Sequence, residues 1–133
     1  MKKLLTTTLA VIALAMPASG AFAAPLPGEM APDFTVTDIE GHEFKLSDHK
    51  GKIVVLEWSN HECPFVRKHY DSGNMQKLQK DAKTKGVEWV TIVSSAEGKQ
   101  GYTTPEEAKA VIAKEGAMPA IKLLDASGEI GKL

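Results

Sequence analysis

The order of apolar and polar residues predicts a chain in which strands alternate with helices. Ile53 to Leu56 is an uninterrupted aliphatic run, which is typical of a strand buried on both faces of a parallel sheet. Val87 to Val93 predicts a second central strand, and Ile121 to Leu124 predicts a third strand. Upstream, apolar residues alternate imperfectly with polar ones over residues 34–46, with a turn at Gly41, which predicts a short hairpin.

The first helix is predicted to follow the first aliphatic run after a short polar loop. Pro64 is a favourable first helical residue, which places Cys63 at the N-cap. Apolar residues then recur at helical spacing as far as Gly86, where glycine is a natural stop. The turn-forming residues at 71–74 predict an interruption of this helix.

A second helix is predicted over residues 105–115, where Thr104 and Glu107 have the spacing of a capping box. The resulting order of strands and helices indicates an α/β fold. In such folds the carboxyl ends of parallel strands meet at one edge of the sheet. Cys63 and the loop 94–103 are therefore expected to lie at the same edge.

Composition narrows the class of protein. The chain has 133 residues, with 16 Lys and Arg against 17 Asp and Glu, so its bulk charge gives no reason to expect nucleic-acid binding. The length suits one domain. A single cysteine rules out a disulfide within these residues.

The N-terminal residues 1–23 have the pattern of a signal peptide. Two lysines precede an apolar run at 4–15, which is shorter than the roughly 20 residues a membrane-spanning helix needs. Ala21-Phe22-Ala23 then has the small residues that a signal peptidase cleaves after. We expect cleavage after Ala23, a mature domain over 24–133, a periplasmic or secreted location, and no membrane association after cleavage.

Cys63 is the candidate nucleophile. Free backbone N–H groups and the positive end of a helix dipole favour a thiolate at an N-cap. Arg67, one turn further on, adds positive charge, and His61 is two residues upstream. The alternative interpretation is a buried, unreactive thiol. If Cys63 is reactive, an external thiol must reduce its oxidised form, because the sequence holds no partner cysteine.

Several segments together resemble the redoxin family, the thioredoxin-like group that includes alkyl hydroperoxide reductase and thiol-specific antioxidant domains. The segments are GEMAPDF at 28–34, GHEFKLSDHKGK at 41–52, IVVLEW at 53–58, CPFVRKHY at 63–70 and LLDASGEIGKL at 123–133. The resemblance covers essentially the whole mature chain. It implies a thioredoxin-like α/β fold, with a central mixed sheet flanked by helices, and a thiol-dependent oxidoreductase or antioxidant activity.

The resemblance assigns Cys63 to the first cysteine of the family's C-x-x-C motif, and Val66 occupies the place of the second. The peroxidase branch carries Pro and Thr or Ser seven and three residues before its cysteine, where this sequence has Leu56 and Asn60. Asn60 is expected to donate a hydrogen bond in place of the Thr or Ser. Both substrates, a peroxide or a disulfide, remain open. The expected reductant is a thioredoxin-like protein or a small thiol.

The resemblance also implies further structure after Leu133. Family members continue to a cis-proline, two strands and a final helix, so we expect a domain that lacks its last strands and helix. In the alternative reading, Met118-Pro119 is itself the cis-proline and the sequence ends in the closing hairpin.

The sequence gives little support for metal or cofactor chemistry. His61, Cys63 and His69 match no standard metal-site spacing, so neither a metal nor a cofactor is expected. Trp58 and Trp89 are predicted to be core residues. Besides the single-cysteine oxidoreductase, two hypotheses stay open: a non-catalytic binding module on the same fold, and an inactive fragment of a redoxin.

Overall fold

The structure, a computed structural model, describes residues 26–133, so the expected signal peptide lies outside the described residues. The elements follow in the order β1 (Thr35–Thr37), β2 (Glu43–Lys45), β3 (Val54–Trp58), α1 (Pro64–Asp71), α2 (Asn74–Thr84), β4 (Glu88–Val93), α3 (Pro105–Glu115) and β5 (Ile121–Leu124). Short 3₁₀ turns cover Leu46–His49 and Ile130–Lys132.

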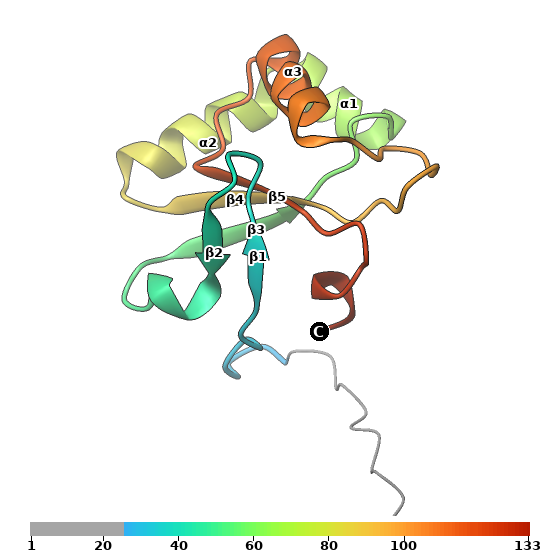
Figure 1. Cartoon of the computed structure of the whole chain (residues 1–133). Coiled ribbons are helices and arrows are strands. Elements are labelled where there is room, and N and C mark those ends of the chain that lie inside the picture. The colour runs from blue at the N-terminus through green and yellow to red at the C-terminus, as the bar shows by residue number, and fades with distance from the viewer. Residues whose placement is uncertain (1–25) are drawn as a thin grey trace, which may run out of the picture.

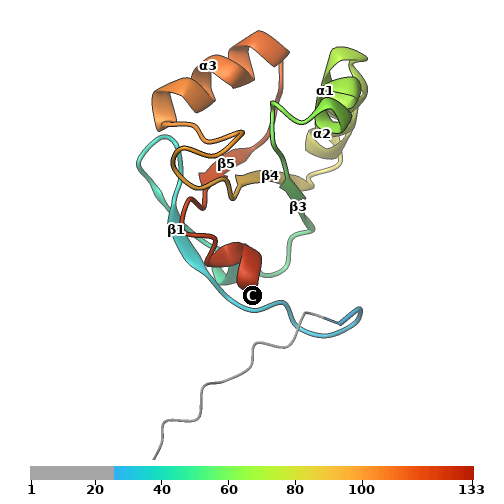
Figure 2. The same cartoon turned by 90° about the vertical axis from the view of Figure 1, so that its right-hand side faces the viewer.

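The centre of the fold is a parallel sheet in the order β3-β4-β5 (Figure 1). Crossovers of one hand between successive strands place their helices on one face of a sheet. Accordingly, α1, α2 and α3 cover one face, while the β1-β2 hairpin and the C-terminal 3₁₀ turn lie on the other (Figures 1 and 2). An antiparallel bridge between Asp38 and Leu123 links the hairpin to β5.

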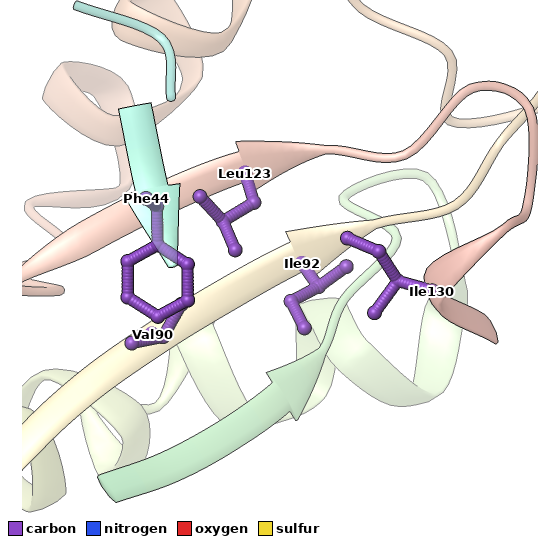
Figure 3. Close-up of a cluster of buried hydrophobic side chains, with 5 residues drawn as sticks. All are labelled: Phe44, Val90, Ile92, Leu123 and Ile130. Atoms are coloured by element: carbon purple, nitrogen blue, oxygen red, sulfur yellow. The ribbon is translucent and has the colours of Figure 1, made fainter. Parts of the chain in front are cut away.

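The hydrophobic core lies between the sheet and the hairpin (Figure 3). Side chains alternate across a strand, so every second residue of β4 and β5 faces the hairpin. The buried cluster consists of Phe44, Val90, Ile92, Leu123 and Ile130. The opposite face of the sheet, under the helices, carries polar side chains that are described with the site below.

The pattern-based predictions of the elements are largely confirmed. The helix begins at Pro64 with Cys63 as its N-cap, and it is interrupted at Ser72 and Gly73. The capping box at Thr104 is formed in both directions. The prediction that Trp58 is a core residue is wrong: the side chain is 49% exposed, because it ends the edge strand β3.

The reading of Met118-Pro119 as a cis-proline is also contradicted. The described part of the chain contains no cis peptide bond. The last residues form a 3₁₀ turn over Ile130–Lys132 and not the strand of a closing hairpin.

A polar cluster at the start of β4 gives the fold a dependence on pH. The Glu88 carboxylate contacts His49 Nδ1 and accepts a hydrogen bond from Lys52 Nζ at 2.6 Å. His49 also stacks on Phe44, with 4.7 Å between the ring centroids. The hydrogen bond from Lys52 is the main cause that holds the pKa of Glu88 below its ordinary value of 4.5, with help from His49.

We predict that Glu88→Gln lowers stability at neutral pH and that this loss disappears in acid. A carboxyl group whose pKa is lowered by folding stabilises the protein above its unfolded-state pKa, and this contribution is lost as the pH falls through the folded pKa. The difference in unfolding free energy between the wild type and the variant should therefore be present at neutral pH and shrink as the pH falls below about 4.5. Urea unfolding at a series of pH values measures this difference, with the exposed Glu43→Gln as control. A difference that grows in acid would contradict the assignment.

Candidate functional site

Cys63 lies just beyond the carboxyl end of β3, at the first turn of α1. Its backbone is extended (φ −69°, ψ 125°), and its carbonyl accepts the first helical hydrogen bond, from Arg67 N–H at 2.9 Å. The thiol makes no capping hydrogen bond and is partly exposed. The first turn holds no acidic residue, and Lys68 and His69 lie in the last turn. This arrangement leaves the N–H groups of the first turn free to stabilise a thiolate.

The loop before Cys63 is fastened to the loop 94–103, as the topology predicts. Asn60 Nδ2 donates to the carbonyl of Gln100 at 3.2 Å, and Asn60 Oδ1 accepts from Glu62 N–H at 2.9 Å. The Glu62 carboxylate in turn accepts from Gly101 N–H at 2.6 Å. The carboxylate next to Cys63 is thus held by the facing loop. The amide of Asn60, expected to assist a substrate, joins the two loops.

A groove opens between α1 and α3 beside this loop, with a volume of about 1120 Å³. His61 and Arg67 line it, so the structure brings these two predicted residues together. Lys114 and Glu115 line the opposite side, from the end of α3. Burial raises the pKa of Glu115, although the nearby Lys122 opposes the shift.

Beneath α1, a buried polar network joins the helix to the sheet. Glu57 of β3 accepts hydrogen bonds from Tyr70 Oη at 2.9 Å, Trp89 Nε1 at 2.7 Å and Thr91 Oγ1 at 3.1 Å. Gln79 Nε2 donates to the Tyr70 hydroxyl at 3.2 Å. Burial, followed by the charge of Glu57, raises the pKa of Tyr70. The network fixes α1, and so the position of its N-terminus, on strands β3 and β4.

The sequence patterns did not reveal this network or the charged end of α3. Glu57 sits inside an apolar run, and its three donors come from elements 13 to 34 residues away. A charged residue directly after an apolar run that predicts a buried strand was the one available signal, since an unpaired charge there is costly. Over residues 26–133, no cluster of three His, Cys, Asp or Glu side chains is placed to hold a metal ion.

A parallel sheet with a cysteine at the N-cap of the helix that follows one of its strands is the arrangement of a thioredoxin-like α/β protein, and the comparisons agree. The AhpC/TSA family model matches residues 27–133. The chain belongs to the AhpC/TSA family. The expectation of a redoxin with a thioredoxin-like fold is thereby confirmed.

Related proteins include thiol-disulfide oxidoreductases. The chain is 30% identical over 118 residues to the thiol-disulfide oxidoreductase ResA of Geobacillus kaustophilus, covering 80% of this chain and 67% of that protein. An uncharacterized conserved protein from Geobacillus kaustophilus has a similar structure, with a TM-score of 0.69, 31% identity, and coverage of 90% of this chain and 62% of that one.

A second solved structure, a putative thiol:disulfide interchange protein DsbE from Chlorobium tepidum, matches with a TM-score of 0.57 and 25% identity over 77% of this chain and 64% of that one. This chain therefore spans less than two thirds of the length of these two structures. Separately, among residues 26–133, no helix is long and apolar enough to cross a membrane.

Proposed function

We propose that this protein is a thiol-dependent oxidoreductase that uses Cys63 to reduce a disulfide. The observation that carries the proposal is the partly exposed Cys63 at the N-cap of α1, whose thiol makes no capping hydrogen bond. Such positions favour the thiolate, which is the reactive form. The similarity to thiol-disulfide oxidoreductases supports a disulfide as the substrate.

The reaction consists of three thiol-disulfide exchanges. The Cys63 thiolate attacks one sulfur of a disulfide, so that a mixed disulfide forms and the other substrate sulfur leaves as a thiolate that takes up a proton. An external thiolate then attacks the Cys63 sulfur and expels the second substrate sulfur as a thiolate, so that the substrate leaves fully reduced. A second external thiolate attacks the outer sulfur of the new mixed disulfide, which releases Cys63 and one disulfide of the external thiol. The last two exchanges need an external thiol because Val66 stands where a resolving cysteine would lie.

A peroxide is the second candidate substrate, because the family model is that of the AhpC/TSA proteins. In that case the thiolate attacks one peroxide oxygen, forms a sulfenic acid and expels an alcohol or water after protonation. Two molecules of thiol then return Cys63 to its reduced state, with release of water and one disulfide. Asn60, His61 and Arg67 remain the predicted supporting residues for either substrate.

We predict that Cys63→Ser reduces thiol-dependent turnover to the uncatalysed background. Serine matches the size of cysteine, so the variant should fold, but its hydroxyl does not ionise near neutral pH to give a nucleophile. Turnover is measured with a small aromatic disulfide or with hydrogen peroxide, in each case with dithiothreitol as reductant. Lys68→Gln, an exposed change on the same helix, is the matched control. Undiminished turnover in the serine variant would favour a non-catalytic binding module.

Two further proposals concern the whole protein. We propose that residues 1–23 direct export to the periplasm or outside the cell; the short apolar run before Ala21-Phe22-Ala23 supports this.

We also propose that the complete domain contains further strands and a helix. In support, β3 pairs only with β4 among the described strands, and Ile53 beside it is largely exposed.

A further inference from the structure

Four of the charged side chains that line the groove between α1 and α3 form no ion pair within the described residues. Arg67 and Asp71 of α1 face Lys114 and Glu115 of α3 across it. None of these four forms an ion pair with another described residue. Each side of the groove thus offers one cation and one carboxylate. Charged groups of both signs in one concave surface suit a ligand that itself carries both charges.

The groove and the reactive sulfur are close in the fold. His61 and Glu62, the residues just before Cys63, line one end of the groove, and Arg67 follows Cys63 by one helical turn. Phe65, next to the cysteine, is 78% exposed and does not line the groove. Cys63 itself does not line the groove, but residues just before it and one turn after it do. An exposed apolar residue and a charged groove thus both adjoin the segment that carries Cys63, which offers separate surfaces for a disulfide substrate and for a reducing thiol.

We propose that this groove binds the external thiol that reduces Cys63, and that this thiol is a small molecule carrying both an ammonium and a carboxylate group, of the amino-acid or short-peptide type. The inference rests on the proposed function, because it concerns the second half of the Cys63 cycle. The carboxylate of the thiol pairs with Arg67 or Lys114, and its ammonium pairs with Asp71 or Glu115. The volume of about 1120 Å³ is ample for such a molecule.

The chemistry balances with the thiol alone as reductant. With Cys63 held as a mixed disulfide with thionitrobenzoate, a thiol attacks the Cys63 sulfur and expels the coloured thionitrobenzoate anion. In this exchange one S–S bond forms and one breaks, and the proton of the attacking thiol goes to solvent. A second molecule of the thiol then attacks the outer sulfur of the new mixed disulfide, which releases reduced Cys63 and one disulfide of the thiol. The rate of colour release therefore measures how well each thiol is delivered to Cys63.

The experiment compares four thiols on this mixed disulfide of the full chain. Cysteine carries both charges, cysteamine only the ammonium, 3-mercaptopropionate only the carboxylate, and 2-mercaptoethanol neither. Each rate is divided by the rate of the same thiol with a small mixed disulfide, which removes differences in intrinsic reactivity. We expect the rate with cysteine to saturate and to exceed that with 2-mercaptoethanol by about tenfold, the size expected from two surface ion pairs. The advantage should shrink in high salt.

Charge removal in the groove identifies the site. Lys114→Gln should lower the advantage of cysteine and 3-mercaptopropionate about threefold and leave cysteamine unchanged, since one exposed ion pair is lost. Glu115→Gln should instead lower the rate advantage of cysteine and cysteamine. Lys83→Gln, an exposed change on α2 that lies outside the groove and removes no ion pair, is the matched control. Equal normalised rates for all four thiols, or equal effects of the changes at Lys114 and Lys83, would overturn the proposal.

Failure of this inference differs from failure of the proposed function. If Cys63 turns over with dithiothreitol but shows no charge preference, the groove is not the reductant site and a protein reductant is favoured. If Cys63→Ser leaves turnover unchanged, the proposed function itself is wrong.

Discussion

Gly101→Ala should destabilise the protein by about 2–3 kcal/mol, about two to three times the cost of the same change at Gly98. Both glycines have positive φ angles, which cost an alanine about 1 kcal/mol. At Gly98 an added Cβ meets nothing within 4 Å, but at Gly101 it would lie 2.4 Å from the side-chain amide of Asn60. The Asn60 side chain must move and give up its hydrogen bonds to Gln100 and Glu62, at about 1 kcal/mol each.

A double variant separates the steric contact from backbone strain. Once Asn60→Ala has removed the amide, adding Gly101→Ala should cost only the strain of the positive φ angle, about 1 kcal/mol. Urea unfolding of the two single variants and the double variant measures this coupling. We also expect slower attack by Cys63 in Gly101→Ala, because the loop that precedes Cys63 loses its attachment to the facing loop. Equal losses at Gly98 and Gly101 would contradict the contact.

The local features of this site were predictable because they depend on neighbouring residues. Pro64 fixes the start of α1, so the N-cap position of Cys63 follows from two adjacent residues. The capping box at Thr104 likewise needs only residues within one turn. The meeting of the loop 94–103 with the Cys63 loop is a long-range feature, but the topology of parallel strands predicted it.

The sequence did not predict the contacts whose partners depend on how the helices and strands pack together. His49 lies among polar residues, which give no indication of a long-range partner, yet it stacks on Phe44 and contacts Glu88, 39 residues away. The position of Lys114 and Glu115 beside α1 depends on how α3 crosses the sheet. Hydrophobic periodicity identifies the face of a helix that is buried, but it does not identify the polar partners of the other residues.

Glu57→Leu should lower the unfolding free energy by about 3 kcal/mol, because it removes the acceptor of a buried network. The hydroxyl groups of Tyr70 and Thr91 belong to side chains that are 5% and 2% exposed, so solvent does not replace the lost carboxylate. An unsatisfied buried donor costs about 1–3 kcal/mol. Tyr70→Phe leaves the Glu57 carboxylate satisfied by its other two donors, but it removes the acceptor of the buried Gln79 Nε2. We therefore expect a smaller loss, of about 2 kcal/mol.

A second substitution, which removes one of the unsatisfied hydroxyl groups, tests whether unsatisfied donors cause this loss of stability. In the double variant Glu57→Leu with Thr91→Val, one orphaned hydroxyl is gone, so stability should recover by about 1 kcal/mol relative to Glu57→Leu alone. Glu43→Leu, an exposed strand position, should stay within about 0.5 kcal/mol of the wild type. Because Tyr70 anchors the end of the helix that Cys63 begins, Glu57→Leu should also slow alkylation of Cys63 at neutral pH by iodoacetamide. Unchanged alkylation together with the expected loss of stability would restrict Glu57 to a structural role, whereas slowed alkylation connects the network under α1 to the reactivity of its N-terminus.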